Sequence, residues 1–150
     1  ISGDIRGEVY IHDCIEISSS SGNIELKQHK NNESKLVDLV TNSGHIIYKG
    51  IVQNTLRARS NSGEIKGNSI VTNGAAIEIS TTSGDIEWKV DEDSSLTFRC
   101  ESKSGDIFTN LEVEGDDISK THDSLSGKIK EGTAKLLLST VSGDLKFHKE

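Results

Sequence analysis

The residues with the most regular spacing and a capacity for chemistry follow a recurring Ser-Gly pair. If the copies stack in chain order, Asp85 and Asp106 become close neighbours, with Glu64 beside Asp85, and such carboxylates repel unless solvated or bridged by a cation. Calcium needs about six or more oxygen ligands from several directions, which a one-dimensional ladder does not supply. We therefore expect solvated turn carboxylates and no metal or cofactor site. The full set of side chains after the motif glycine is Asp4, Asn23, His45, Glu64, Asp85, Asp106, Lys128 and Asp144.

Catalysis on carbohydrate needs carboxylates and a basic residue that converge on one cleft. The outward acids of this chain are scattered, and its arginines are few: Arg6, Arg57, Arg59 and Arg99. Arg57 and Arg99 share an outward column with Glu78 between them, which predicts a charge-complementary cross-strand ladder. Tyr48 and Trp88 fall on the inward phase and are expected in the core. The sequence thus predicts a protein that is not an enzyme and has no catalytic residue.

The two cysteines are expected to stay unpaired. Cys100 falls in an inward column and Cys14 on the outward phase four repeats away, which is roughly 19 Å at the strand spacing and beyond disulfide reach. Cys100 is then a small core residue. Cys14 and His12 share an outward face, but a nucleophile also needs a third orienting group and an oxyanion pocket.

The elements that hold these side chains are set by the repeat itself. The motif SGDI or a close variant has its glycine at Gly3, Gly22, Gly44, Gly63, Gly84, Gly105, Gly127 and Gly143. Successive glycines are 16 to 22 residues apart, a period typical of solenoids, propellers and other arrays. Glycine allows a tight bend without a Cβ penalty.

Period-two alternation on both sides of the motif predicts a strand before and a strand after each bend. Two residues after the glycine stand Ile5, Ile24, Ile46, Ile65, Ile86, Ile107, Ile129 and Leu145. Seven residues before it stand Ile15, Val37, Leu56, Ile77, Phe98 and Leu136, and three before it stands Ser or Thr. No helical period occurs anywhere in the chain.

A unit of this length cannot bury its own inner face, so neighbouring units must stack. We predict an all-β fold, a single-stranded β-solenoid of about seven to eight coils with a period near 20 residues and a length of about 35 Å. Residues 1–150 form one domain. The lack of methionine and an opening inside a motif indicate a fragment of a longer chain.

One repeat departs from the pattern. Residues 118–131 place Lys120, His122 and Glu131 in columns that are aliphatic elsewhere, which predicts an irregular coil near one end. The alternative is a local site built on Asp116, Asp117, His122 and Asp123.

Composition limits the partners. The net charge of −7 argues against nucleic acid, whose phosphates need Lys and Arg patches, and against simple docking on anionic lipid. No apolar run reaches the length of a membrane span, so membrane insertion is not expected.

The clearest copies of the motif are Thr82-Ser83-Gly84-Asp85-Ile86 and Lys103-Ser104-Gly105-Asp106-Ile107. This pattern resembles the adhesin family of bacterial β-strand-repeat proteins, an SGDI-repeat domain of unknown function. The resemblance covers essentially the whole chain and implies a β-solenoid with a cell-envelope or extracellular role, while leaving an intracellular location open. Departures are Lys128, His45 and the region around His122.

Three functions follow. The first is a non-enzymatic surface or cell-envelope interaction module that presents a rigid repeat face to a protein or glycan partner. The second is a structural scaffold that self-associates end to end through exposed strand edges at the solenoid ends. The third, the least favoured, is a β-helix enzyme acting on polysaccharide.

Overall fold

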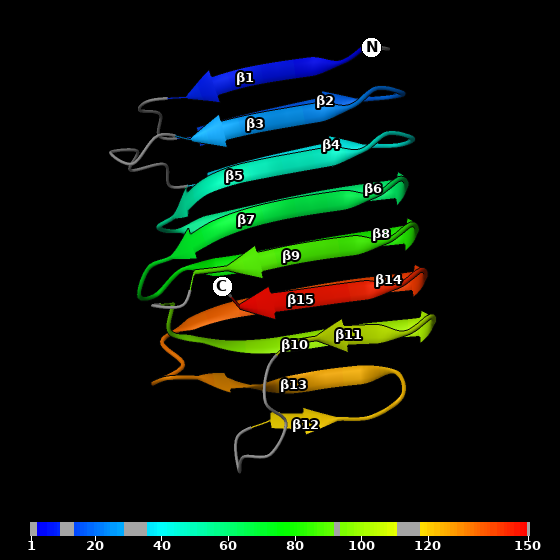
Figure 1. Ribbon diagram of the computed structural model, residues 1–150. Helices are drawn as coiled ribbons and strands as arrows, with labels where there is room; N and C mark the ends of the chain where they lie inside the picture. Colours follow the sequence, from blue (N-terminus) through cyan, green and yellow to red (C-terminus); the bar gives the residue numbers. More distant parts are fainter. Residues whose placement is uncertain (1–2, 10–13, 29–35, 92–93, 111–117, 150) are drawn as a thin grey trace.

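The computed structural model describes residues 3–9, 14–28, 36–91, 94–110 and 118–149. The described residues are all-β and form two long sheets of mainly parallel strands, with β1 at one end of the stack and β12 at the other (Figure 1). From β1 to β11 the described strands alternate between the two sheets, and the Ser-Gly bends carry the chain from the eight-stranded sheet to the seven-stranded one. This solenoid-like architecture agrees with the fold class expected from the repeat.

The seven-stranded sheet contains the strands that follow the bends. These are β1 (Ile5–Val9), β3 (Ile24–Gln28), β5 (Ile46–Val52), β7 (Ile65–Val71), β9 (Ile86–Val90), β11 (Ile107–Thr109) and β15 (Leu145–Lys149). The eight-stranded sheet contains β2 (Cys14–Ser19), β4 (Leu36–Thr41), β6 (Thr55–Ser62), β8 (Ala76–Ser83), β10 (Leu96–Ser104), β12 (Ile118–Lys120), β13 (Ser124–Ile129) and β14 (Ala134–Ser142).

The core lies between the sheets and is built from the predicted inward columns. Ile24, Ile46, Ile65 and Ile86 are fully buried one above another. The column seven residues before each glycine is buried as well, from Ile15 to Leu136. Because alternate residues of a strand point to opposite faces, the charged residues between them lie outside. One continuous hydrophobic cluster links the two sheets.

The aromatic rings of Tyr48 and Trp88 explain why one inward column has a glycine, Gly67, in place of a large side chain. Tyr48 and Trp88 lie two strands apart, with Gly67 between them in register. The rings nevertheless stack, with centroids 6.1 Å apart and planes 8° from parallel. They lean into the space above Gly67, where an added Cβ would come within 2.1 Å of the Trp88 ring. The missing side chain at residue 67 therefore makes room for the indole.

Chain order does not give the order of the strands in space, contrary to the expected stacking. The last strand pair, β14 and β15, is inserted between earlier pairs: β14 lies between β8 and β10, and β15 lies between β9 and β11 (Figure 1). All of these contacts are parallel and keep the columns in register, as in Ile77, Leu136 and Phe98. The insertion is possible because the C-terminal repeat carries the same column residues as its neighbours.

The irregular repeat is an antiparallel hairpin and not a slipped coil. Strand β13 pairs antiparallel with the outer edge of β10, and β12 pairs antiparallel with β13. Gly127 consequently lies inside a strand, opposite Phe98, and forms no bend. His122 and Glu131 are exposed and do not enter the inward columns, because the reversed strand buries Leu125 and Ile129.

Candidate functional site

The polar side chains after the motif glycines form a hydrogen-bonded ladder along the bend edge. Five of these side chains accept a hydrogen bond from the backbone N–H of the same position in the neighbouring strand pair. The five bonds span 2.8 to 3.0 Å, donor first: Asn23 to Asp4, His45 to Asn23, Glu64 to His45, Asp144 to Asp85, and Asp106 to Asp144. These groups are therefore more than solvated turn residues, because they satisfy backbone donors that the bend leaves unpaired.

A second ladder explains the hydroxyl three residues before each glycine. In six repeats the hydroxyl donates to the carbonyl oxygen of the glycine in the neighbouring strand pair, at 2.9 to 3.3 Å, donor first: Ser19 to Gly3, Thr41 to Gly22, Ser60 to Gly44, Thr81 to Gly63, Thr140 to Gly84, and Ser102 to Gly143. A Cβ on the next glycine would lie only 2.0 to 2.2 Å from the same carbonyl oxygen. Close backbone stacking thus requires glycine at the bend.

The expected contact between Asp85 and Asp106 is wrong. Asp144 of the inserted pair lies between them, accepts from Asp106 and donates its N–H to Asp85. Within the described ranges, no group of three or more His, Cys, Asp or Glu side chains is arranged to hold a metal ion.

The alternative site around His122 comes together only in part. His122 Nε2 lies 4.0 Å from Asp106 Oδ1, with both side chains largely exposed. Asp123 accepts a hydrogen bond from the Thr121 hydroxyl at 2.9 Å, within the turn of the hairpin. Asp116 and Asp117 lie outside the described residues. The described members of this set therefore serve the turn or meet a neighbouring bend, without forming a pocket.

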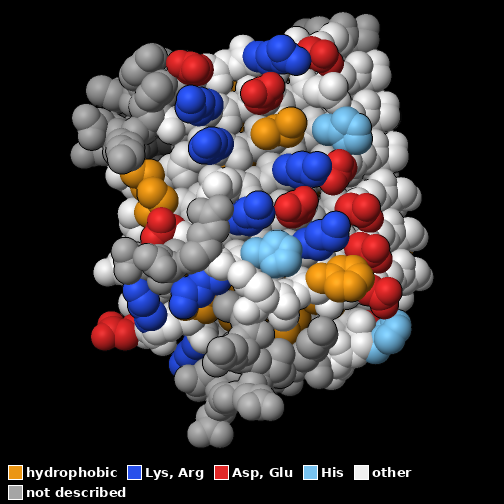
Figure 2. Space-filling model, in the orientation of Figure 1, with side chains coloured by type: hydrophobic (Ala, Val, Ile, Leu, Met, Phe, Trp, Pro, Cys, Tyr) orange, Lys and Arg blue, Asp and Glu red, His pale blue; other side chains and the backbone are white. Residues whose placement is uncertain are grey.

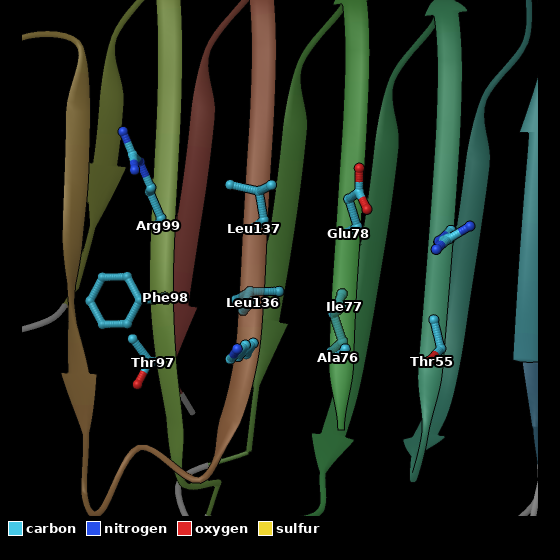
Figure 3. A pocket seen from close by; sticks show the side chains of 11 residues that line it. Thr55, Ala76, Ile77, Glu78, Thr97, Phe98, Arg99, Leu136 and Leu137 are labelled. Carbon is cyan, nitrogen blue, oxygen red and sulfur yellow. The ribbon is translucent and has the colours of Figure 1, made fainter. Parts of the chain in front are cut away.

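The expected ladder of Arg57, Glu78 and Arg99 is also interrupted by the insertion. Leu137 lies between Glu78 and Arg99 (Figure 3). Arg99 instead pairs with Glu101 on its own strand. Leu137 is 37% exposed and lies at the wall of a shallow groove of about 490 Å³ on the outer face of the eight-stranded sheet. The groove mixes one carboxylate with several cations and has no converging pair of acids.

The cysteines are free, as expected: Cys14 is exposed and Cys100 is buried. Burial raises the pKa of Cys100 to about 12, so this thiol is unreactive at neutral pH. The Cys14 thiol lies 3.9 Å from Glu16 Oε1. His12 lies outside the described residues. Tyr48 is buried, as predicted, which raises its pKa, and its hydroxyl donates to Gln28.

A feature that the sequence reasoning missed lies on the outer face of the seven-stranded sheet. Five residues after successive motif glycines, adjacent strands carry one continuous row. We call this the basic row: Lys27, Lys49, Asn68, Lys89 and His148. Figure 2 shows Lys and Arg side chains spread over this face, with acidic side chains gathered along its right margin. The sequence contains this signal at the position five residues after the motif glycine. The sequence reasoning considered only the inward positions after the glycine and therefore missed it.

The fold and the ladders define a class of protein: an all-β, solenoid-like repeat protein whose motif residues hold the stack together. The family model described as Toastrack DUF4097, a domain of unknown function, matches residues 1–148. The chain belongs to this family. Neither the curated proteins nor the solved structures contain a match. The family description assigns no function, so the adhesin role implied by the repeat stays a prediction. No helix among the described residues is long and apolar enough to cross a bilayer.

Proposed function

We propose that this protein is a non-enzymatic interaction module of the cell surface or envelope, which presents a rigid sheet face to a protein or glycan partner. One observation carries the proposal: the outer face of the seven-stranded sheet has a charge opposite to that of the whole chain. Its described Lys, Arg, Asp and Glu side chains are six cations and three carboxylates, namely Arg6, Lys27, Lys49, Lys66, Lys89 and Lys146 against Glu8, Glu25 and Glu87. The chain as a whole carries −7.

Rigidity supports a binding role. Strands β3, β5, β7, β9 and β15 are each paired on both sides, and the bend edge is fixed by the two ladders of hydrogen bonds. A face that is already ordered loses little conformational entropy when a partner binds. The non-enzymatic part of the proposal is supported by the bend carboxylates, because Asp4, Asp85 and Asp144 each accept a backbone N–H and are engaged structurally.

The test is binding of the purified chain to a panel of bacterial and eukaryotic cell surfaces and to a glycan array. We expect saturable binding that falls when Lys49, Lys66 and Lys146 are changed to Glu. The matched control changes Arg57, Arg59 and Lys135 of the opposite sheet to Glu, which alters net charge equally. Absence of saturable binding to every surface and glycan, or turnover of any glycan, would overturn the proposal.

End-to-end assembly is the second candidate, and one observation favours it. Among the described residues, β1 and β2 each have a partner strand on one side only, and unpaired edges can recruit another chain. At the other end of the stack, the hairpin of β12 and β13 disfavours assembly, because the eight-stranded sheet ends there with a three-residue antiparallel strand. Light scattering behind a sizing column tests this: a mass that stays monomeric over a wide concentration range excludes assembly.

A further inference from the structure

The basic row has the geometry of a linear binding site. It crosses five adjacent strands, β3, β5, β7, β9 and β15, in register. At the spacing of neighbouring strands, its ends lie about 19 Å apart. The only carboxylate in register with it among the described residues is Glu8, beyond its Lys27 end.

Two members of the row are like charges on neighbouring strands. Lys27 and Lys49 are direct cross-strand partners, and such a pair destabilises a sheet. Among the described residues neither ammonium group has an ion-pair or hydrogen-bond partner. Arg6, Lys66 and Lys89 on the same face do have carboxylate partners, at 3.3 to 4.0 Å. The two unpaired lysines are therefore free to meet an external anion.

We infer that the basic row binds a linear anionic glycan with one carboxylate per sugar, laid across the strands. This inference rests on the proposed function and names the partner class. The backbone of these inner strands is already paired, so only side chains can recognise a ligand on this face. Lysine ammonium groups supply charge, and the Asn68 amide can bond to hydroxyl or carboxylate oxygens in the middle of the row.

Recognition through side chains alone favours a glycan over an acidic peptide. An extended peptide gains its affinity for a sheet mainly from main-chain hydrogen bonds to a free strand edge, and β3, β5, β7, β9 and β15 are paired on both sides. The row instead offers the ammonium groups of Lys27, Lys49 and Lys89, with the Asn68 amide between the last two.

Shallow hollows beside the row give sugar rings a place to lie. One, of about 290 Å³, is lined by Lys27, Lys49, Gly50, Asn68 and Ile70 among others. The other, of about 220 Å³, includes Lys49, Gly67, Asn68 and Lys89. Both hollows share Lys49 and Asn68, so the row runs between them.

The experiment is calorimetric titration of the full chain with oligogalacturonate, its methyl ester as the uncharged control, and oligoglutamate as the peptide control. We expect oligogalacturonate to bind, with an affinity that falls as salt rises, and the two controls to bind at least tenfold more weakly. The variant Lys27→Gln/Lys49→Gln/Lys89→Gln should lose at least tenfold in affinity. The matched variant Arg57→Gln/Arg59→Gln/Lys135→Gln on the opposite sheet should change it by less than twofold.

Equal losses in the two variants, equal binding of oligoglutamate, or no binding of oligogalacturonate would each overturn the inference. Circular dichroism of both variants shows that a loss is not unfolding. The proposed function is tested separately. If the chain still binds cells while oligogalacturonate neither binds nor competes, the proposed interaction module is retained and only its glycan assignment is wrong.

Discussion

Substitution of Gly67 by alanine tests how the two core rings are accommodated. The new Cβ would lie 2.1 to 2.4 Å from three carbons of the Trp88 ring, whereas nonbonded carbons prefer about 3.5 Å or more. Trp88 is fully buried, stacks on Tyr48 and donates its indole N–H to Ser69 at 3.1 Å, so the ring has little room to retreat. Overpacking of this kind costs about 1–3 kcal/mol, and we expect the upper end.

Trp88 is the single tryptophan of the chain, so its fluorescence reports directly on this site. A loss of about 3 kcal/mol in a domain of this size lowers the Tm by roughly 6–12 °C. Urea titration followed by Trp88 emission and by circular dichroism should show a lower midpoint for Gly67→Ala. In a Trp88→Leu background the same change should cost under about 0.5 kcal/mol, because leucine leaves the space free.

The chain supplies a matched control at the equivalent position of an earlier repeat. A Cβ on Gly7 would meet only Leu26 Cδ1, at 3.9 Å, which is an ordinary contact. Gly7→Ala should therefore leave the midpoint within about 0.5 kcal/mol of the original. If Gly67→Ala unfolds at the unchanged midpoint with unchanged Trp88 emission, the packing of the indole over Gly67 is wrong.

Three further predictions concern strand order and the buried thiol. In a Cys14→Ser background, oxidation should cross-link Arg99→Cys with Leu137→Cys, because residues 99 and 137 are register partners. Arg99→Cys and Glu78→Cys should not cross-link. The opposite result on a gel would mean that the strands stack in the order of the chain. In the original chain, a thiol reagent at neutral pH should modify Cys14 alone until denaturant is added, and two fast-reacting thiols would contradict the burial of Cys100. Burial raises the pKa of Cys100 from 9.0 to about 12, so its contribution to stability is complete below pH 9 and is lost between pH 9 and 12, at about 1.4 kcal/mol per pH unit. Denaturation measured across this range should show the decline, and Cys100→Ala should reduce it.

The inward columns could be read from the sequence because burial acts on every copy alike. Ile24, Ile46, Ile65 and Ile86 occupy one position relative to the glycine, and a stacked parallel strand must bury that position wherever the copy lies. The glycine and the hydroxyl three residues before it were predictable for the same reason. What the sequence did not show was the partner of that hydroxyl, since a bond to the neighbouring glycine carbonyl depends on stacking distance.

The order of the stack was unpredictable from these columns because they are interchangeable. Leu136 packs between Ile77 and Phe98, and a direct contact between Ile77 and Phe98 would satisfy the same column. The wrong strand order also made the prediction for the charged positions wrong. Glu78 and Arg99 were expected to be complementary neighbours, but the exposed Leu137 separates them. The basic row was missed for a different reason. Its residues stand five positions after the motif glycine, where the residue type varies between repeats and the motif no longer applies.

Connections, and not column chemistry, decide where the last strand pair goes. Strand β13 runs antiparallel along the outer edge of β10 and ends beside the start of that strand, with Ile129 opposite Leu96. A short turn follows, with Lys130 at φ 55° and Gly132 at φ 69°, and Thr97 donates its hydroxyl to the Gly132 carbonyl at 3.1 Å.

Because β13 already occupies one edge of β10, the chain emerging from this turn can pair only with the other edge. That edge faces β8, so β14 enters between them, with Ala134 donating to the Ser95 carbonyl at 3.1 Å. The ladders continue through the insertion, since each bond made with the inserted pair joins a backbone group to a hydroxyl or a carboxylate. A hydrogen bond of this kind contributes about 0.5–1.5 kcal/mol whichever pair supplies it. The repeat thus specifies that strand pairs stack, and the hairpin specifies which pairs become neighbours.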